Sequence, residues 1–147
     1  MKFNSDGDIL FICLYVDDLI FTGNSSSMIE DFKYSMKKEF EMTDLGLMTY
    51  FLGIEVIQDN GGIFISQENY AKEVLKKFSM EDCLPTDTPI EFGTKLTKEG
   101  EGKYINPTYY KSLVGCLRYL TCTRPDILFG VGLISRYMET PKTSHLN

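Results

Sequence analysis

The sequence predicts an α+β protein in which two β-hairpins, each followed by a helix, precede a purely helical region. Short apolar runs bounded by turn residues fill 9–22 and 50–65, a pattern typical of strands. Apolar residues then recur at helical intervals over 27–40, 66–78 and 106–138, as they do in amphipathic helices. This order of elements predicts a mixed front part and an all-helical rear part.

The composition is that of an ordinary soluble domain. The chain has 147 residues, of which 43% are hydrophobic and 24% charged. With a net charge of −6, the chain as a whole lacks the excess of basic residues that nucleic-acid-binding proteins usually have. Any role with nucleic acid therefore requires a local basic face.

The first hairpin is predicted around a pair of adjacent carboxylates. The continuous apolar run over 9–15 predicts a buried strand, and the run over 19–22 predicts its partner. Asp17 and Asp18 stand between the two runs, where a tight turn is expected. Ser27 and Glu30 then have the spacing of a capping box. The helix that follows has an apolar stripe made of Ile29, Phe32, Met36 and Phe40.

The second hairpin is predicted from two runs, 50–57 and 63–65, that flank a turn-rich segment over 59–62. Ser66 is expected to cap the next helix. The core stripe of that helix is predicted to be Ala71, Val74, Leu75 and Phe78.

The segment over 84–103 is rich in Pro and Gly, and it is predicted to be a linker, a flap or partly disordered. Asn106 and Pro107 then begin a helix. The stripe of this helix is Tyr110, Leu113, Val114, Leu117 and Leu120, and a last helix carries Ile127, Val131, Ile134 and Met138 before Pro141. The chain is thus predicted to divide into 1–83, a loop or linker over 84–104, and 105–147.

The cysteines point to a reducing compartment, either the cytoplasm or the nucleus. Cys13, Cys83, Cys116 and Cys122 form no CxxC pair, so a zinc site is not expected. Cys13, Cys116 and Cys122 lie in apolar patterns and are expected to be buried thiols. No signal peptide is recognised at the start, and no apolar run approaches the ~20 residues that span a bilayer. No membrane association and no small-molecule ligand are expected.

The strongest chemical signal is the tetrapeptide Tyr15-Val16-Asp17-Asp18. Two adjacent carboxylates between apolar strands are costly unless they are solvated or bind a cation. Mg²⁺ prefers such oxygen ligands, and nucleotidyl transfer uses them in two-metal sites. A plain turn that happens to contain Asp explains the four residues equally well.

Further motifs turn this signal into a resemblance to the reverse transcriptases of copia-type, long-terminal-repeat retrotransposons. The chain carries Tyr-x-Asp-Asp within a strand-turn-strand, then Asp44-Leu45-Gly46 and Tyr50-Phe51-Leu52-Gly53-Ile54-Glu55. Farther on it carries Tyr110-Lys111-Ser112-Leu113-Val114-Gly115 and Thr123-Arg124-Pro125-Asp126-Ile127, all in the order found in that family. The resemblance covers nearly the whole chain and implies a partial palm, made of two β-hairpins plus a helix, followed by a helical, thumb-like or connection region.

The resemblance also implies roles for individual residues. Asp17 and Asp18 would be metal ligands, with Tyr15 beside them in the catalytic turn. Phe51, Leu52 and Gly53 would lie in the primer grip, although Phe51 and Leu52 also fit the core. The candidates for nucleic-acid binding are Lys72, Lys76, Lys111, Arg118 and Arg124. Solvated helix faces or ion pairs explain these cations equally well, and Arg118 and Arg124 could pair with Asp126 or Glu139.

The same resemblance implies a catalytically incomplete chain. Reverse transcriptases use a third carboxylate from an earlier palm strand, and only fourteen residues precede Tyr15. The two carboxylates are therefore expected to be vestigial and to bind no Mg²⁺ tightly, although the ancestral enzyme uses it. An exposed palm edge is expected to form a homodimer or to bind another protein. A domesticated protein-interaction or regulatory module and a weak RNA- or DNA-binding remnant are the alternative functions.

Overall fold

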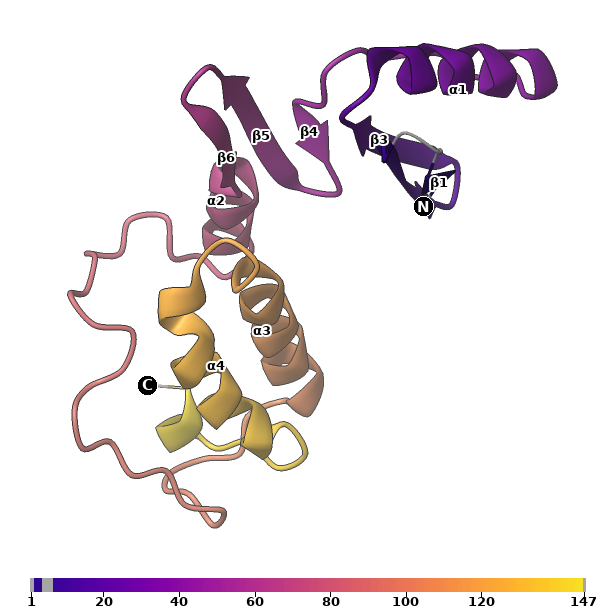
Figure 1. Ribbon diagram of the computed structural model, residues 1–147. Helices are drawn as coiled ribbons and strands as arrows, with labels where there is room; N and C mark the ends of the chain where they lie inside the picture. Colours follow the sequence, from indigo (N-terminus) through magenta and orange to yellow (C-terminus); the bar gives the residue numbers. More distant parts are fainter. Residues whose placement is uncertain (1, 4–6, 147) are drawn as a thin grey trace. The chain divides into compact units, whose positions relative to one another are not determined.

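The computed structural model describes residues 2, 3 and 7–146, and it is a mixed α/β structure with two small antiparallel sheets (Figure 1). The chain divides into two compact units, Met1–Met48 and Thr49–Asn147. Each unit contains one of the sheets. The division expected at 83 and 105 stays a prediction.

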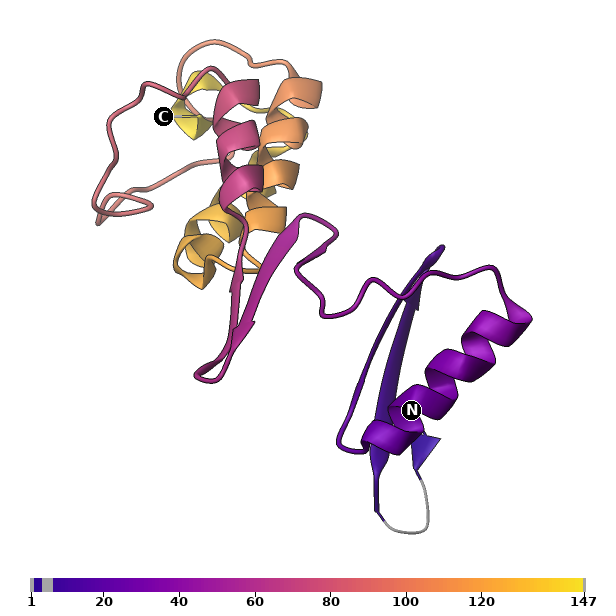
Figure 2. The same cartoon turned by 90° about the horizontal axis from the view of Figure 1, so that it is seen from above.

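The first unit is a β-hairpin extended by a short strand and covered by a helix. Strands β1 (Lys2–Phe3), β2 (Ile9–Tyr15) and β3 (Asp18–Gly23) pair in the order β1-β2-β3, which confirms the first hairpin. Helix α1 (Ser26–Glu39) packs against β3 (Figure 2). The rings of Phe21 and Phe32 meet edge-on there, with centroids 5.3 Å apart.

The prediction of a buried strand over 9–15 is wrong. Leu10 is buried in β2, but the strand from Phe11 to Tyr15 is exposed, and Leu14 keeps 68% of its surface in solvent. An apolar run indicates that a strand can be buried. It does not indicate whether other residues of the same unit pack against that strand.

The capping box is also wrong. Helix α1 begins at Ser26 with Ser25 as its N-cap, and the side chain of Ser25 does not bond to the helix backbone. Ser27 lies inside the first turn, where its hydroxyl is 3.1 Å from that of Ser25. Glu30 pairs instead with Lys33 at 3.1 Å.

The second unit opens with a three-stranded sheet in the order β4-β5-β6. The strands are β4 (Tyr50–Phe51), β5 (Ile54–Asp59) and β6 (Gly62–Ser66). The hairpin around Asp59 is confirmed, but the expected continuous strand over 50–57 is broken by a two-residue turn at Leu52 and Gly53.

Three α-helices complete the second unit: α2 (Glu68–Lys77), α3 (Pro107–Leu120) and α4 (Leu128–Ile134). Helix α3 contacts both α2 and α4 (Figure 1). The 3₁₀ turns η1 (Pro125–Ile127) and η2 (Ser135–Tyr137) flank α4, and η3 (Thr143–His145) follows. The buried apolar side chains of these helices are Val74, Tyr110, Val114, Leu120 and Val131.

The predicted helix starts are only partly correct. Asn106 caps α3 as expected, because its Oδ1 accepts hydrogen bonds from the amides of Thr108 and Tyr109. Ser66 does not cap α2, whose N-cap is Gln67. Leu75, which is expected in the core stripe of α2, is 43% exposed.

The cysteine prediction needs correction too. All four cysteines are free thiols, but Cys13 and Cys122 are exposed and Cys116 is only half-buried. Cys13 lies in the stretch of β2 from Phe11 to Tyr15 that is exposed to solvent. The cytoplasmic or nuclear location stays a prediction. Across the described residues, no helix is both long and apolar enough to cross a membrane.

Candidate functional site

The two adjacent carboxylates lie at the tip of the β2–β3 hairpin. Tyr15 and Asp18 form the last pair of the ladder, so Val16 and Asp17 make a two-residue turn. Both Asp17 and Asp18 are exposed to solvent. Tyr15 is 51% exposed and belongs to the same tip. The sequence therefore located this turn correctly, although Asp18 lies in the strand rather than in the loop.

The turn is strained at Val16. Its φ of 51° lies in the left-handed region, which a β-branched side chain rarely adopts. Two-residue hairpin turns with a positive φ at the first position normally contain Gly there. Backbone strain of this kind tends to be retained where function needs a fixed geometry. The strain therefore marks the carboxylate turn as a place to look for function.

The donor set fits part of a magnesium site. Carboxylate oxygens are the hard ligands that Mg²⁺ prefers, and Mg²⁺ is commonly held by one or two carboxylates together with waters and phosphate oxygens. Within residues 2–3 and 7–146, no group of three or more His, Cys, Asp or Glu side chains is placed to hold a metal ion. Asp17 and Asp18 thus suit an open two-carboxylate site and do not form a closed cage.

The primer-grip-like residues lie in the second unit. Phe51 ends β4, and Leu52 and Gly53 form the turn to β5 with φ values of 49° and 81°. Leu52 is 42% exposed, whereas Phe51 is half-buried. The assignment of these residues to a primer grip stays a prediction.

Two of the five candidate phosphate-binding cations are engaged in ion pairs. Lys72 lies 2.6 Å from Glu68, and this hydrogen bond raises the pKa of Lys72. Arg124 donates two hydrogen bonds to Asp126, at 2.9 and 2.7 Å, so it takes one of the pairings that the sequence left open. This pair raises the pKa of Arg124 and lowers that of Asp126.

The other three cations are exposed. Lys76 lies on α2, and Lys111 and Arg118 lie on α3. Arg118 also lines a pocket of about 330 Å³ between α3 and α4, together with Leu128 and Val131 among others. Nucleic-acid binding by these residues stays a prediction.

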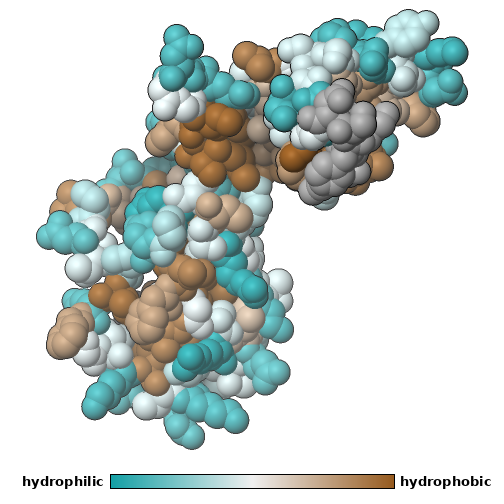
Figure 3. Space-filling model, viewed as in Figure 1, coloured by the Kyte–Doolittle hydropathy of each residue, from teal (hydrophilic) through white to brown (hydrophobic). Residues whose placement is uncertain are grey.

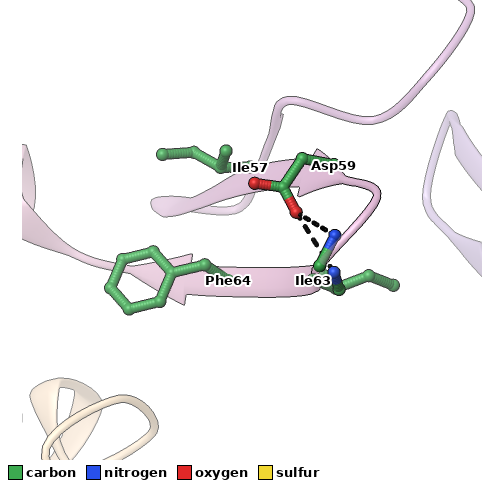
Figure 4. Close-up of a pocket in the computed structure, with 6 residues that line it drawn as sticks. Ile57, Asp59, Ile63 and Phe64 are labelled. Atoms are coloured by element: carbon green, nitrogen blue, oxygen red, sulfur yellow. Dashed lines mark hydrogen bonds between the residues drawn. The ribbon is translucent and has the colours of Figure 1, made fainter.

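A second pocket of about 330 Å³ lies on the β5–β6 hairpin (Figure 4). Its carboxylate belongs to Asp59, which accepts hydrogen bonds from the amides of Gly61 and Gly62 at 2.7 and 3.1 Å. The same hairpin carries exposed apolar side chains, which gather there in the space-filling view (Figure 3). The turn uses Oδ1 of Asp59, so this pocket combines a turn carboxylate with the exposed apolar side chains of Ile57, Ile63 and Phe64.

Sequence reasoning missed three residues that organise the second unit. Glu55 on β5 accepts hydrogen bonds from Ser66 Oγ and from the amide of Asn69. Gln67, only 3% exposed, accepts one from Thr123 Oγ1, and Tyr119 donates one to the carbonyl of Leu52. These four hydrogen bonds join different elements of the chain, 11 to 67 residues apart, so no local sequence pattern predicts them.

Comparisons with known proteins identify the family. The reverse transcriptase (RNA-dependent DNA polymerase) family matches residues 1–92. The chain is 38% identical over 133 residues to an uncharacterized mitochondrial protein of Arabidopsis thaliana, covering 90% of this chain and 55% of that protein. It is 34% identical over 150 residues to the retrovirus-related Pol polyprotein from transposon TNT 1-94 of Nicotiana tabacum, covering 96% of this chain and 11% of the polyprotein.

A third relative is the retrovirus-related Pol polyprotein from transposon RE2 of Arabidopsis thaliana, which is 34% identical over 139 residues, or 95% of this chain and 10% of that protein. The chain thus spans about half the length of the mitochondrial relative and about a tenth of the two polyproteins. No solved structure matches the chain significantly. The family match includes the Asp17–Asp18 turn, and the relatives extend the similarity through α3. The chain therefore belongs to the reverse transcriptase (RNA-dependent DNA polymerase) family and corresponds to a segment of its copia-type members.

Proposed function

We propose that this chain supplies the catalytic turn, the primer-grip hairpin and the thumb helices of a copia-type RNA-directed DNA polymerase. The observation that supports this most directly is the pair of exposed carboxylates, Asp17 and Asp18, at the tip of a strained hairpin inside the matched region. The comparisons favour neither a protein-interaction module nor a nucleic-acid-binding remnant over this function.

Each part of the chain has a task in this proposal. Asp17 and Asp18 would hold Mg²⁺, which would stabilise the negative charge that develops on the transferring phosphate. The turn at Leu52 and Gly53 holds the primer end by backbone position. The exposed cations of α2 and α3 contact backbone phosphates of the duplex, which fixes its register without reading its sequence.

The 147 residues by themselves are proposed not to polymerise. Among the residues that the structure describes, two carboxylates meet at the turn, and template, primer and nucleotide must all be positioned before nucleotidyl transfer is accelerated. The third carboxylate and the nucleotide-binding surface would come from other palm and fingers residues. The exposed side of β2 would then be covered by those residues, by a second copy of this chain or by another protein.

Primer extension on an RNA template with Mg²⁺ or Mn²⁺ tests the proposal. The chain alone should add no nucleotides. A copia-type polymerase in which this chain replaces the matching segment should extend the primer, and Asp17→Asn with Asp18→Asn should abolish the extension. An inactive hybrid beside an active parent, or activity of the isolated chain that requires Asp17, would overturn the proposal.

A further inference from the structure

The turn between β4 and β5 adopts an unusual backbone conformation. Leu52 and Gly53 both have positive φ, at 49° and 81°. Two-residue hairpin turns with two positive φ values favour Asn or Gly, and a leucine there is disfavoured. Something outside the turn must therefore help to stabilise it.

Tyr119 of α3 provides contacts to both turn residues. Its hydroxyl donates a hydrogen bond to the carbonyl of Leu52. Its ring lies against Gly53, since a Cβ on that glycine would be 3.4 Å from Tyr119 Cε1. Gly53 is thus favoured for its φ, and even a Cβ there would be in ordinary van der Waals contact with the ring.

Tyr119 is itself held in place by a second tyrosine. Its ring meets that of Tyr70 edge-on, with centroids 4.9 Å apart and planes at 84°. The Tyr70 hydroxyl is 3.5 Å from the carbonyl oxygen of Cys116, to which it donates. Burial, followed by an interaction with the Cys116 side chain, raises the pKa of Tyr70 to about 12.

A further contact joins the same end of α3 to the sheet. Thr123, just after α3, donates a hydrogen bond of 2.8 Å to Gln67 Oε1, and Gln67 connects β6 to α2. The C-terminal end of α3 is therefore tied to the sheet at both the β4–β5 turn and the β6–α2 junction. The helix and the turn have a fixed relation within this unit.

We infer that Tyr119 is a positioning residue that fixes the Leu52–Gly53 turn on α3, so that the turn meets the primer terminus in one orientation. The part that concerns the primer rests on the proposed function. The part that concerns the turn rests on the contacts of Tyr119 alone. Two measurements separate these parts.

The first measurement is amide hydrogen exchange in the isolated chain. Tyr119→Phe keeps the ring and removes the hydroxyl, so exchange at Ile54 and Val56 should become roughly five to ten times faster, the size expected for one lost hydrogen bond. Exchange at Val114 within α3 should stay within about twofold. Tyr109→Phe, which removes a hydroxyl at the other end of α3, should change neither. Unchanged exchange near the turn, or equal acceleration at Val114, overturns the positioning role.

The second measurement compares two RNA–DNA duplexes, one with a recessed primer 3′ end and one blunt. The wild-type chain should prefer the recessed duplex, and Tyr119→Phe should lose the preference while binding the blunt duplex equally well. A preference that survives in Tyr119→Phe overturns the inference about the primer. Absence of any preference in the wild type overturns the proposed function, and the exchange comparison still decides whether Tyr119 fixes the turn.

Discussion

Two glycines before α3, Gly100 and Gly102, lie directly against the side chains of His145 and Thr143. Gly100 has a φ of 51°, and a Cβ there would lie 2.8 Å from the ring of His145. Gly102 has a φ of 86°, and a Cβ there would lie 1.8 Å from Thr143 Oγ1. Neither position can accept a side chain without a shift of its neighbour, so both glycines are required by conformation and by space.

The substitution Gly102→Ala should destabilise the chain by about 1–3 kcal/mol, because alanine meets both the left-handed backbone and the Thr143 hydroxyl. Gly115→Ala is the matched control. Gly115 is an exposed residue inside α3, and a methyl group added there would have no neighbouring atom within 4 Å, so alanine should stabilise the chain by about 1 kcal/mol. Urea unfolding measures both values, and a loss at Gly115 equal to that at Gly102 would contradict the steric argument.

At the scale of the elements, the first turn of helix α2 is stabilised by Glu55, a side chain of strand β5. The Glu55 carboxylate accepts hydrogen bonds from the amide of Asn69 at 3.1 Å and from Ser66 Oγ at 3.0 Å. A negative charge beside the first turn of a helix is favourable. The amide hydrogen bond, followed by that of Ser66, lowers the pKa of Glu55 in the folded chain below its ordinary value of 4.5.

This lowered pKa predicts an acid-dependent loss of stability. The contribution of Glu55 is fully present above the unfolded pKa and is lost as the pH falls through the lower, folded pKa. The free energy of unfolding of Glu55→Gln should therefore lie below that of wild type at pH 7, and the gap should close as the pH falls below 4.5. Glu73→Gln, on the exposed side of α2, serves as the control and should follow the wild-type curve. A gap that stays constant from pH 7 to acid would exclude this role for Glu55.

The irregular segment before α3 has two different halves. Phe92 is fully exposed, whereas from Leu96 onward the backbone forms hydrogen bonds with residues near the C-terminal end, between 137 and 145. Tyr137 Oη donates to the carbonyl of Leu96 at 2.8 Å, and His145 Nε2 lies 2.9 Å from that of Thr97. His145 Nδ1 accepts from the amide of Lys142, which leaves the proton on Nε2 to be donated to Thr97.

A glutamate-specific protease should detect this difference. Cleavage after Glu91 should be ~10-fold faster than cleavage after Glu101. The Glu101 backbone is bound by Ser144, 43 residues away, and must be released before it is cut, whereas the hydrogen bonds to the Glu91 carbonyl come from Thr94 in the same local turn. His145→Ala should accelerate cleavage after Glu101 and leave the rate after Glu91 unchanged. Thr86→Ala, in the first half of the segment, is the control and should leave both cleavage rates unchanged. Equal rates at the two sites in wild type would show that the second half is as mobile as the first.

At the scale of the whole molecule, the sequence predicted what local chemistry decides. The two hairpins, the carboxylate turn and the start of α3 at Asn106 follow from turn residues, periodicity and a cap, and the structure contains all of them. The family relation followed from the order of several motifs, and the comparisons confirm it. The exposure of β2 and the cap supplied by Glu55 could not be predicted, because each depends on what the rest of the chain brings or fails to bring to a local segment.

The net charge of −6 is the whole-molecule property that most constrains nucleic-acid binding. Long-range repulsion opposes approach to a polyanion, so binding must come from a local basic face and should weaken steeply with salt. Lys111 is exposed, and no ion pair to it is found in the described part of the chain, whereas Lys72 is paired with Glu68 at 2.6 Å.

Lys111→Gln should therefore lower the slope of log affinity against log salt by about one for an RNA–DNA duplex, the change expected for one lost phosphate contact. Lys72→Gln, the matched control, should lower the slope less, because Glu68 already neutralises Lys72 in the free chain. Fluorescence anisotropy between low and moderate salt measures both slopes. Equal slopes in wild type and Lys111→Gln would remove Lys111 from the phosphate-binding face, and a larger effect at Lys72 would mean that the duplex displaces Glu68 and that the basic face lies on α2 rather than on α3.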